Sequence, residues 1–247
     1  MNSILDQTAH RPFPVPASPW VMKQSWCDLL FAHWPVPAAQ LRNCIPAGLE
    51  LDTYGDDAWV GVVPFAMKAV YPRLLMPLPW ISYFLELNVR TYVRRQGIPG
   101  VYFFSLDCSN PVAVKIARQF FHLPYFDARM SLARRGNEIH YESKRLKSGQ
   151  EFRAVYSPVE ANPVALDGSI EHFLTERYCL FTSDKSGRLY QGNIHHLPWP
   201  LQKAEAEIIT NTMISEDLGF RLPDCEPLLH FSERLDTFEW ALQAVAL

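Results

Sequence analysis

The sequence is poor in the residues and runs that mark several specialised classes of protein. It has five cysteines in 247 residues, widely spaced and without a CxxC pair, which argues against a disulfide framework and a zinc site. We expect each cysteine to act as a small buried apolar residue. No run approaches the roughly 18 apolar residues of a transmembrane helix, and no signal-peptide pattern opens the chain. These absences predict a cytoplasmic protein that does not engage a membrane.

Charge and short motifs exclude further classes. The net charge is −3 and no basic run is present, whereas a nucleic-acid partner requires a basic patch or stripe. The sequence has no HExxH, GxSxG, Walker A or GxGxxG motif, and its eight histidines are scattered. We therefore expect no metal, no cofactor and no nucleic-acid partner. A Ser–His–Asp triad stays open, since its members need not be neighbours in sequence.

What is present indicates one β-rich domain. Apolar residues make up 48% of the chain, enough for a large core, and 20 prolines against 11 glycines indicate many short elements with rigid corners. Residues 1–18 read as a loose N-terminal arm, and 19–247 as a single domain without repeats or linkers. Strands outnumber helices and the turns resemble those of hairpins. The predicted fold class is mainly β (α+β), an antiparallel barrel with a few short peripheral helices.

The expected elements follow from hydrophobic periodicity and turn residues. Strands are predicted at 20–34, 49–53, 57–70 with a break or bulge at Pro64, 83–95, 101–107, 126–134, 137–146, 151–157, 177–183, 188–195, 200–210, 228–233 and 236–241. Helices are predicted at 37–43, 111–121, shortly after Ser169, and at 212–218. The helix at 111–121 is the clearest, because Asn110 suits its N-cap and Pro111 its first position.

Segment 71–82 is both proline-rich and strongly apolar. It could be a loop packed on the core. It could equally be a lid or an oligomer contact, because exposed apolar patches commonly mark contact surfaces.

The strand at 84–93 carries the most informative pattern. Leu85 and Leu87 begin an apolar face, while Glu86, Asn88, Arg90 and Tyr92 fall on the opposite face. One interpretation is a half-buried strand whose polar face is solvated. The other is that this face lines a cavity, which we favour because the following strand is aromatic on both faces, as a buried strand would be. In that case Glu86 and Arg90 would form an ion pair inside the cavity.

Several blocks of the sequence resemble known families. Residues 37–52 (PAAQLRNCIPAGLELD) and 83–130 resemble two blocks of the acetoacetate decarboxylases. A closer resemblance, covering roughly residues 20–240, is to the YqjF-like family of uncharacterised bacterial proteins in the same superfamily. It is carried by FAHWPVP (31–37), GLELD (48–52), AWVGVVPF (58–65), ELNVRTYV (86–93) and FHLPYFDARM (121–130). The resemblance implies an acetoacetate-decarboxylase-like fold.

The resemblance also exposes a missing nucleophile. The decarboxylases use a lysine of a Pro-Lys-Lys segment to form a Schiff base, and here that segment reads Pro124-Tyr125-Phe126. Lys115 lies nine residues earlier on the polar side of its helix and is expected to be solvated. Acetoacetate decarboxylation is therefore not expected. The family's glutamate corresponds to Glu86, and Tyr125 takes the nucleophile's place, either as a general acid or as a core aromatic.

Three functions remain open. The first is an enzyme that holds a carboxylic or carbonyl ligand through Asn88, Arg90, Tyr92 and Phe103. It would perform lyase, aldol or dehydratase chemistry with Glu86 as base and Tyr125 as acid. The second is a non-catalytic protein whose cavity binds a small ligand, in keeping with the aromatic residues Trp20, Trp26, Trp34, Trp80 and Phe103. The third is an interaction protein, a possible homo-oligomer, with 71–82 as the contact. Fold alone does not choose among them.

Overall fold

The computed structural model describes residues 3–78, 80–161 and 165–245. Its strands are β1 (Met22–Pro37), β2 (Glu50–Leu51), β3 (Asp57–Pro72), β4 (Phe84–Arg95), β5 (Ile98–Cys108), β6 (Tyr125–Arg135), β7 (Glu138–Arg145), β8 (Glu151–Ala161), β9 (Cys179–Ser183), β10 (Leu189–His195), β11 (Gln202–Asn211), β12 (Leu228–Glu239) and β13 (Gln243–Ala244). Its helices are α1 (Ala38–Leu41), α2 (Pro111–Phe120) and α3 (Ile170–Thr175), with 3-10 turns η1 (Ile4–Asp6), η2 (Arg42–Cys44) and η3 (Glu216–Leu218). The predicted mainly-β chain with short helices is confirmed.

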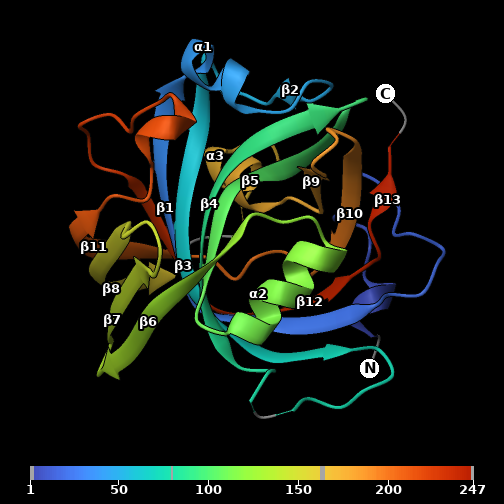
Figure 1. Ribbon diagram of the computed structural model, residues 1–247, viewed down its shortest axis with the longest axis horizontal. Helices are drawn as coiled ribbons and strands as arrows, with labels where there is room; N and C mark the ends of the chain where they lie inside the picture. Colours follow the sequence, from blue (N-terminus) through green and yellow to red (C-terminus); the bar gives the residue numbers. More distant parts are fainter. Residues whose placement is uncertain (1–2, 79, 162–164, 246–247) are drawn as a thin grey trace.

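The strands join into one ring-like sheet, shown in Figure 1. Pairings run from β10 through β9, β5, β4, β3, β1 and β12, and β12 pairs again with β10, which closes a circuit. A second circuit shares β5, β4, β3, β1 and β12 and returns through β11, β8, β7 and β6. The sheet is not purely antiparallel as predicted, because β5 pairs in parallel with both β6 and β9. The parallel pair with β6 requires a crossover, and α2 lies in that connection.

Most local signals were read correctly. Asn110 caps α2 by accepting hydrogen bonds from the amides of Val112 and Ala113, and Ser169 caps α3. The hairpin of β4 and β5 turns at Gln96 and Gly97, both with positive φ, which is typical of a two-residue hairpin turn. Two predictions were wrong in detail. Only η3 forms within 212–218, and the strands at 228–233 and 236–241 are one continuous strand, β12.

The break or bulge expected at Pro64 is confirmed, but the bulge lies in the neighbouring strand β1 rather than in β3 itself. β3 continues through Pro64, which stays in register with Leu87 of β4. The pairing of β3 with β1, however, is interrupted between the pairs Cys27–Ala66 and Ala32–Val62. Proline has no amide hydrogen to donate to this ladder. β1 bulges opposite it, with Asp28 at a φ of 52°.

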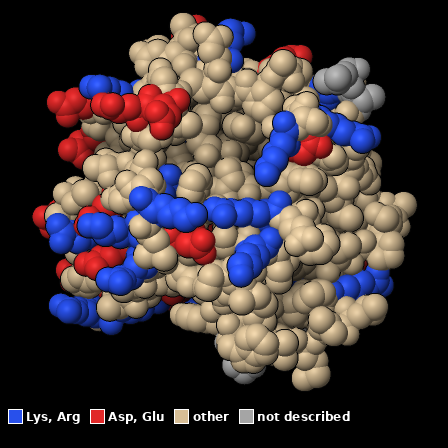
Figure 2. Space-filling model, in the orientation of Figure 1, with Lys and Arg blue, Asp and Glu red and all other residues tan. Residues whose placement is uncertain are grey.

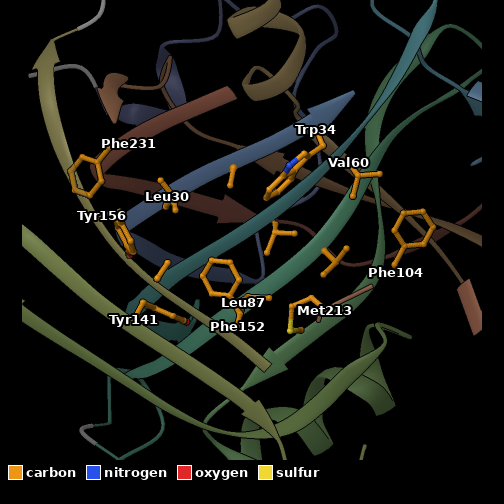
Figure 3. Close-up of a cluster of buried hydrophobic side chains, with 14 of the residues drawn as sticks. Leu30, Trp34, Val60, Leu87, Phe104, Tyr141, Phe152, Tyr156, Met213 and Phe231 are labelled. Carbon is orange, nitrogen blue, oxygen red and sulfur yellow. The ribbon is translucent and has the colours of Figure 1, made fainter. Parts of the chain in front are cut away.

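The shared strands separate two hydrophobic cores. Because successive side chains of a strand point to opposite faces, Leu30 and Ala32 of β1 enter one core while Leu29 and Phe31 enter the other. The first core lies within the circuit that contains β7 and β8. Its larger members are shown in Figure 3 pointing toward one another: Leu30, Trp34, Val60, Leu87, Phe104, Tyr141, Phe152, Tyr156, Met213 and Phe231. The second core surrounds the cavity described below.

Two peripheral features differ from expectation. The N-terminal arm packs on the domain rather than lying detached, since the buried guanidinium of Arg11 donates to the Ile194 carbonyl at 2.6 Å and lies over the Tyr178 ring. Cys225 is exposed, unlike the buried residue we expected, whereas Cys27, Cys108 and Cys179 are buried. No helix among the described residues is long and apolar enough to span a membrane.

Most of segment 71–82 is exposed, since residues 72–78 and Trp80 face solvent while Ile81 is partly buried and Ser82 is buried. Leu74 and Met76 are 92% and 81% exposed, and Trp80 is 70% exposed. In Figure 2 the lower part of the molecule, where Figure 1 places this segment, carries few charged residues. The interpretation of 71–82 as a lid or contact stays a prediction.

A buried ion pair between β5 and β7 gives a stability prediction. Arg145 Nε donates to Asp107 Oδ1 at 2.5 Å, and Ser143 Oγ donates to Asp107 Oδ2 at 2.9 Å, with Asp107 fully buried. We expect Arg145→Met to lower the free energy of unfolding by about 3–5 kcal/mol, because it leaves a buried carboxylate without its counter-charge. Urea unfolding measures this loss. The double variant Asp107→Asn/Arg145→Met should recover most of it, and equal losses in single and double variants would argue against the pair.

Candidate functional site

A cavity of about 240 Å³ lies inside the circuit formed by β10, β9, β5, β4, β3, β1 and β12. Its wall is mostly apolar, and α2 and Ile81 contribute to its rim. The polar side chains that line it come from several elements: Gln24, Glu86, Asn88, Arg90, Tyr125, Thr175, Arg177, His196 and Glu239. Convergent polar groups in a largely apolar cavity are typical of small-molecule sites.

The alternation of β4 places the predicted residues as the cavity interpretation requires. Glu86, Asn88 and Arg90 all line the cavity, and Phe103 of β5 lines it from the neighbouring strand. Glu86 is 2% exposed and Asn88 4%, so the solvated-face interpretation is wrong. Tyr92 continues the same face but lies beyond the cavity. There its hydroxyl donates to the Leu174 carbonyl at 2.8 Å and lies 2.6 Å from His33 Nε2.

Tyr125 and Glu86 are in direct contact. The Tyr125 hydroxyl donates to Glu86 Oε2 at 2.7 Å. Tyr125 begins β6, where the parallel pairing with Leu106 of β5 fixes its backbone, and the Arg118 guanidinium of α2 donates to its carbonyl at 2.7 Å. The carbonyl of Glu86 in turn accepts a hydrogen bond from the Tyr141 hydroxyl at 2.7 Å. Three further elements, β5, α2 and β7, therefore hold the two residues in position.

Burial sets the protonation of this pair. Removal from water raises the pKa of Glu86 to about 8, although hydrogen bonds from Tyr125 and Asn88 offset part of the effect and the nearby charge of Asp107 adds to it. Burial and the adjacent Glu86 raise the pKa of Tyr125 well above its usual value. At neutral pH the carboxyl of Glu86 therefore holds a proton, and Tyr125 stays a phenol.

The two arginines of the cavity differ in their partners. Arg177 donates to Asp52 Oδ2 at 2.6 Å and is neutralised there. Arg90 forms no ion pair with any described residue; Nη2 approaches the Leu174 carbonyl at 3.4 Å, and Nε is buried without a hydrogen-bond partner. The predicted ion pair of Glu86 with Arg90 is thus wrong, because the carboxyl turns instead toward Tyr125 and Asn88. Arg90 is left as the cation available to an anionic ligand.

Glu239 is a site residue that the sequence prediction missed. It ends β12, pairs with Met22 of β1 and Ile194 of β10, and lines the cavity. The signal was present, since Leu235, Thr237 and Glu239 share one face of the strand and the first two are buried. A glutamate in phase with buried residues is expected to face inward. The sequence prediction divided this strand into 228–233 and 236–241, which concealed the alternation of its side chains.

Aromatic residues form the remaining wall. Trp26 and Trp199 stack at a centroid distance of 5.7 Å, and both line the cavity with His196. Burial lowers the pKa of His196 to about 4, partly opposed by its backbone hydrogen bonds, so the ring is neutral. Of the aromatic residues named as ligand contacts from sequence, Trp26 and Phe103 line the cavity. The others, Trp20, Trp34 and Trp80, do not.

The cavity offers no lysine among the described residues that line it. Lys115 is exposed on the outer side of α2, which confirms that it is solvated. Within the described ranges, no cluster of three or more histidine, cysteine or acidic side chains could hold a metal ion. The polar groups of the lining are carboxyl, phenol, amide, guanidinium, imidazole and hydroxyl groups.

Comparisons with solved structures identify the fold. The acetoacetate decarboxylase of Legionella pneumophila superposes with a TM-score of 0.61 at 14% identity, covering 100% of this chain and 96% of that one. An acetoacetate decarboxylase-like enzyme from Sphingomonas wittichii gives 0.65 at 13% identity, covering 95% and 98%. The enduracididine biosynthesis enzyme MppR, in complex with pyruvate, gives 0.65 at 10% identity, covering 95% and 93%. The acetoacetate-decarboxylase-like fold is confirmed.

Sequence comparisons identify the family. The protein YqjF of Bacillus subtilis, described as uncharacterized, is 47% identical over 231 residues, which cover 93% of this chain and 94% of that protein. A family model of uncharacterized conserved proteins, DUF2071, matches residues 23–236. The chain therefore belongs to the DUF2071 family and is similar over nearly its whole length to YqjF.

Proposed function

We propose that this protein is an enzyme that binds a small carboxylic or carbonyl compound in the ring cavity and acts on it by acid–base chemistry without a Schiff-base lysine. The observation that carries the proposal is the buried Glu86 carboxyl, which accepts a hydrogen bond from Tyr125 in the cavity that also holds the Arg90 cation. Carboxyl groups with strongly shifted pKa values cluster at catalytic sites. MppR, with the same fold, has been solved with pyruvate bound.

The roles of Glu86 and Tyr125 differ from those expected from sequence. Tyr125 directs its hydroxyl hydrogen toward Glu86 and its pKa is raised, so it orients the carboxyl rather than supplying a proton itself. Glu86 has a pKa of about 8, close to neutral pH, which suits a group that gives up and regains a proton in turn. Glu86 is thus the acid–base residue and Tyr125 a positioning residue.

A second function has an observation of its own. The stacked Trp26 and Trp199 and the largely apolar wall would also suit a protein that only stores or senses a small aromatic acid. The two functions separate at Glu86. If the protein only binds its ligand, neither the wild type nor Glu86→Gln turns the ligand over, and the affinity changes little. If it is an enzyme, the wild type turns the ligand over and Glu86→Gln does not.

Arg90 supplies the binding test. We expect Arg90→Met to weaken the binding of small monocarboxylates about tenfold or more, because a hydrogen bond to a charged group contributes about 1.5–3 kcal/mol. Isothermal titration calorimetry across a panel of monocarboxylates measures this. Arg153→Met, which removes an exposed arginine of β8, is the matched control. Equal affinities for wild type and Arg90→Met would contradict the assignment of Arg90.

The raised pKa of Glu86 also predicts how stability varies with pH. Between about pH 4.5 and 8 the unfolded chain ionises this carboxyl while the folded chain keeps it protonated, so stability falls as the pH rises through this window. Glu86→Gln should therefore lose less stability than wild type between pH 5 and 8, by a few kcal/mol at most. Urea unfolding at successive pH values measures the slopes. The control is the exposed Glu205→Gln, and identical slopes in wild type and Glu86→Gln would exclude a protonated Glu86.

A further inference from the structure

We propose that Glu239 is a second acid–base residue of this cavity, and that it works with Glu86 as a carboxyl pair that enolises a small oxo acid. The proposal rests on the proposed function, because it assumes that the cavity binds a carboxylic or carbonyl compound, and it names the substrate class and the first chemical step. An oxo acid carries both groups that the cavity addresses, a carboxylate for Arg90 and a carbonyl for a carboxylic acid.

Glu239 has no partner within the protein to explain its position. Its carbonyl accepts a backbone hydrogen bond from Val21 at 2.7 Å. Its carboxyl, in contrast, forms neither a hydrogen bond nor an ion pair with any described residue, and it lines the cavity. Glu239 is partly buried, and an ionised carboxylate is costly to withdraw from water without a partner. A carboxyl that faces an apolar cavity alone is therefore explained best by a role toward whatever occupies that cavity.

Glu86 and Glu239 reach the cavity from different walls. β3 and β1 separate β4 from β12 on one side of the circuit, and β5, β9 and β10 separate them on the other. The carboxyls nevertheless line one shared cavity of about 240 Å³. Burial raises the pKa of Glu239 to about 8, and the charge of Glu86 contributes to that rise. A carbonyl compound held between them would have one carboxyl on its oxygen and the other beside its α-carbon.

The other charged groups around Glu86 and Glu239 do not neutralise a charge on these carboxyls. Tyr125 of β6 contacts Glu86 as a neutral phenol, and the Asp107 carboxylate of β5 lies behind it, already paired with Arg145. Arg177 is paired with Asp52.

The remaining titratable neighbours are His196, which is neutral, and Arg90 on β4 itself. β1 and β3 line the cavity without a charged side chain, contributing Gln24, Trp26 and apolar residues. Cys108, at the end of β5, stays a thiol because burial and nearby carboxyls raise its pKa. Glu86 and Glu239 are thus the groups of this cavity that change charge near pH 8.

The enolisation step balances with these groups alone. With one carboxyl ionised and the other protonated, the ionised carboxylate removes a proton from the carbon next to the carbonyl. The C–H electron pair forms the carbon–carbon double bond of the enol, and the carbonyl oxygen takes the proton of the other carboxyl. The pair ends with its proton on the opposite residue, so the total number of bound protons is unchanged and no cofactor is consumed. Reversal returns a proton from the site to carbon.

Exchange of carbon-bound hydrogen tests this step. Pyruvate is the probe, since its methyl hydrogens lie next to a carbonyl and the step would replace them with deuterium in heavy water. We expect the wild-type protein to accelerate loss of the methyl proton NMR signal over buffer, with a bell-shaped pH dependence centred near pH 8. Glu239→Gln and Glu86→Gln should each lower the exchange rate about a hundredfold, whereas Glu205→Gln, a matched exposed change, should not.

Calorimetric titration with pyruvate, run in parallel, keeps the two proposals distinct. Binding without exchange in the wild type would overturn the carboxyl pair and leave the proposed function standing, and absence of both would contradict both. Exchange that persists in Glu239→Gln would also overturn the pair. If Glu239→Gln fails to fold, Glu239→Asp decides: it keeps a carboxyl but withdraws it by one methylene, so the exchange rate should fall while the bell-shaped profile is retained. An unchanged rate would exclude Glu239.

Discussion

The site depends on the burial of a carboxyl that has no counter-charge. Glu86 is enclosed by the ring of strands and accepts a hydrogen bond from Tyr125. It forms no ion pair with Arg90, which lies four residues further along β4. Water is therefore replaced by a phenol and an amide, which stabilise the carboxylate less than solvent does, and the proton is retained. A cation next to Glu86 would have fixed it as a carboxylate and removed its ability to exchange a proton near neutral pH.

The double circuit of strands explains how such a group can be held. β1, β3 and β4 belong to both circuits, so each has a core on both faces, and the first core fixes the strands whose other faces line the cavity. Leu87 and Val89 anchor β4 in that first core while Glu86, Asn88 and Arg90 point the other way. The cost of enclosing polar groups is offset by the apolar burial on the opposite face of the same strand. Close packing of a strand on both faces holds the side chains that line a site in fixed positions.

Much of this could be predicted from the sequence because the signals were local. The period of two in β4 placed Glu86 and Arg90 on one face, and Asn110 and Ser169 marked the starts of two helices. The partners of these residues could not be predicted, since they depend on pairings between distant strands. Glu86 meets Tyr125 through the parallel pairing of β5 with β6, and Arg177 meets Asp52 across 125 residues of sequence. Glu239 was missed because its strand was divided in two.

The described residues that line the cavity include no lysine. A lysine nucleophile holds its substrate as a covalent imine, and the carboxyl, phenol and guanidinium groups of this cavity form none. The central claim is therefore that Glu86 is a neutral acid at physiological pH. Infrared difference spectroscopy of wild type against Glu86→Gln at pH 7 tests it most directly. The account predicts a protonated carboxylic C=O band that is lost in the variant and disappears from wild type above about pH 8, and a carboxylate band in its place at pH 7 would contradict it.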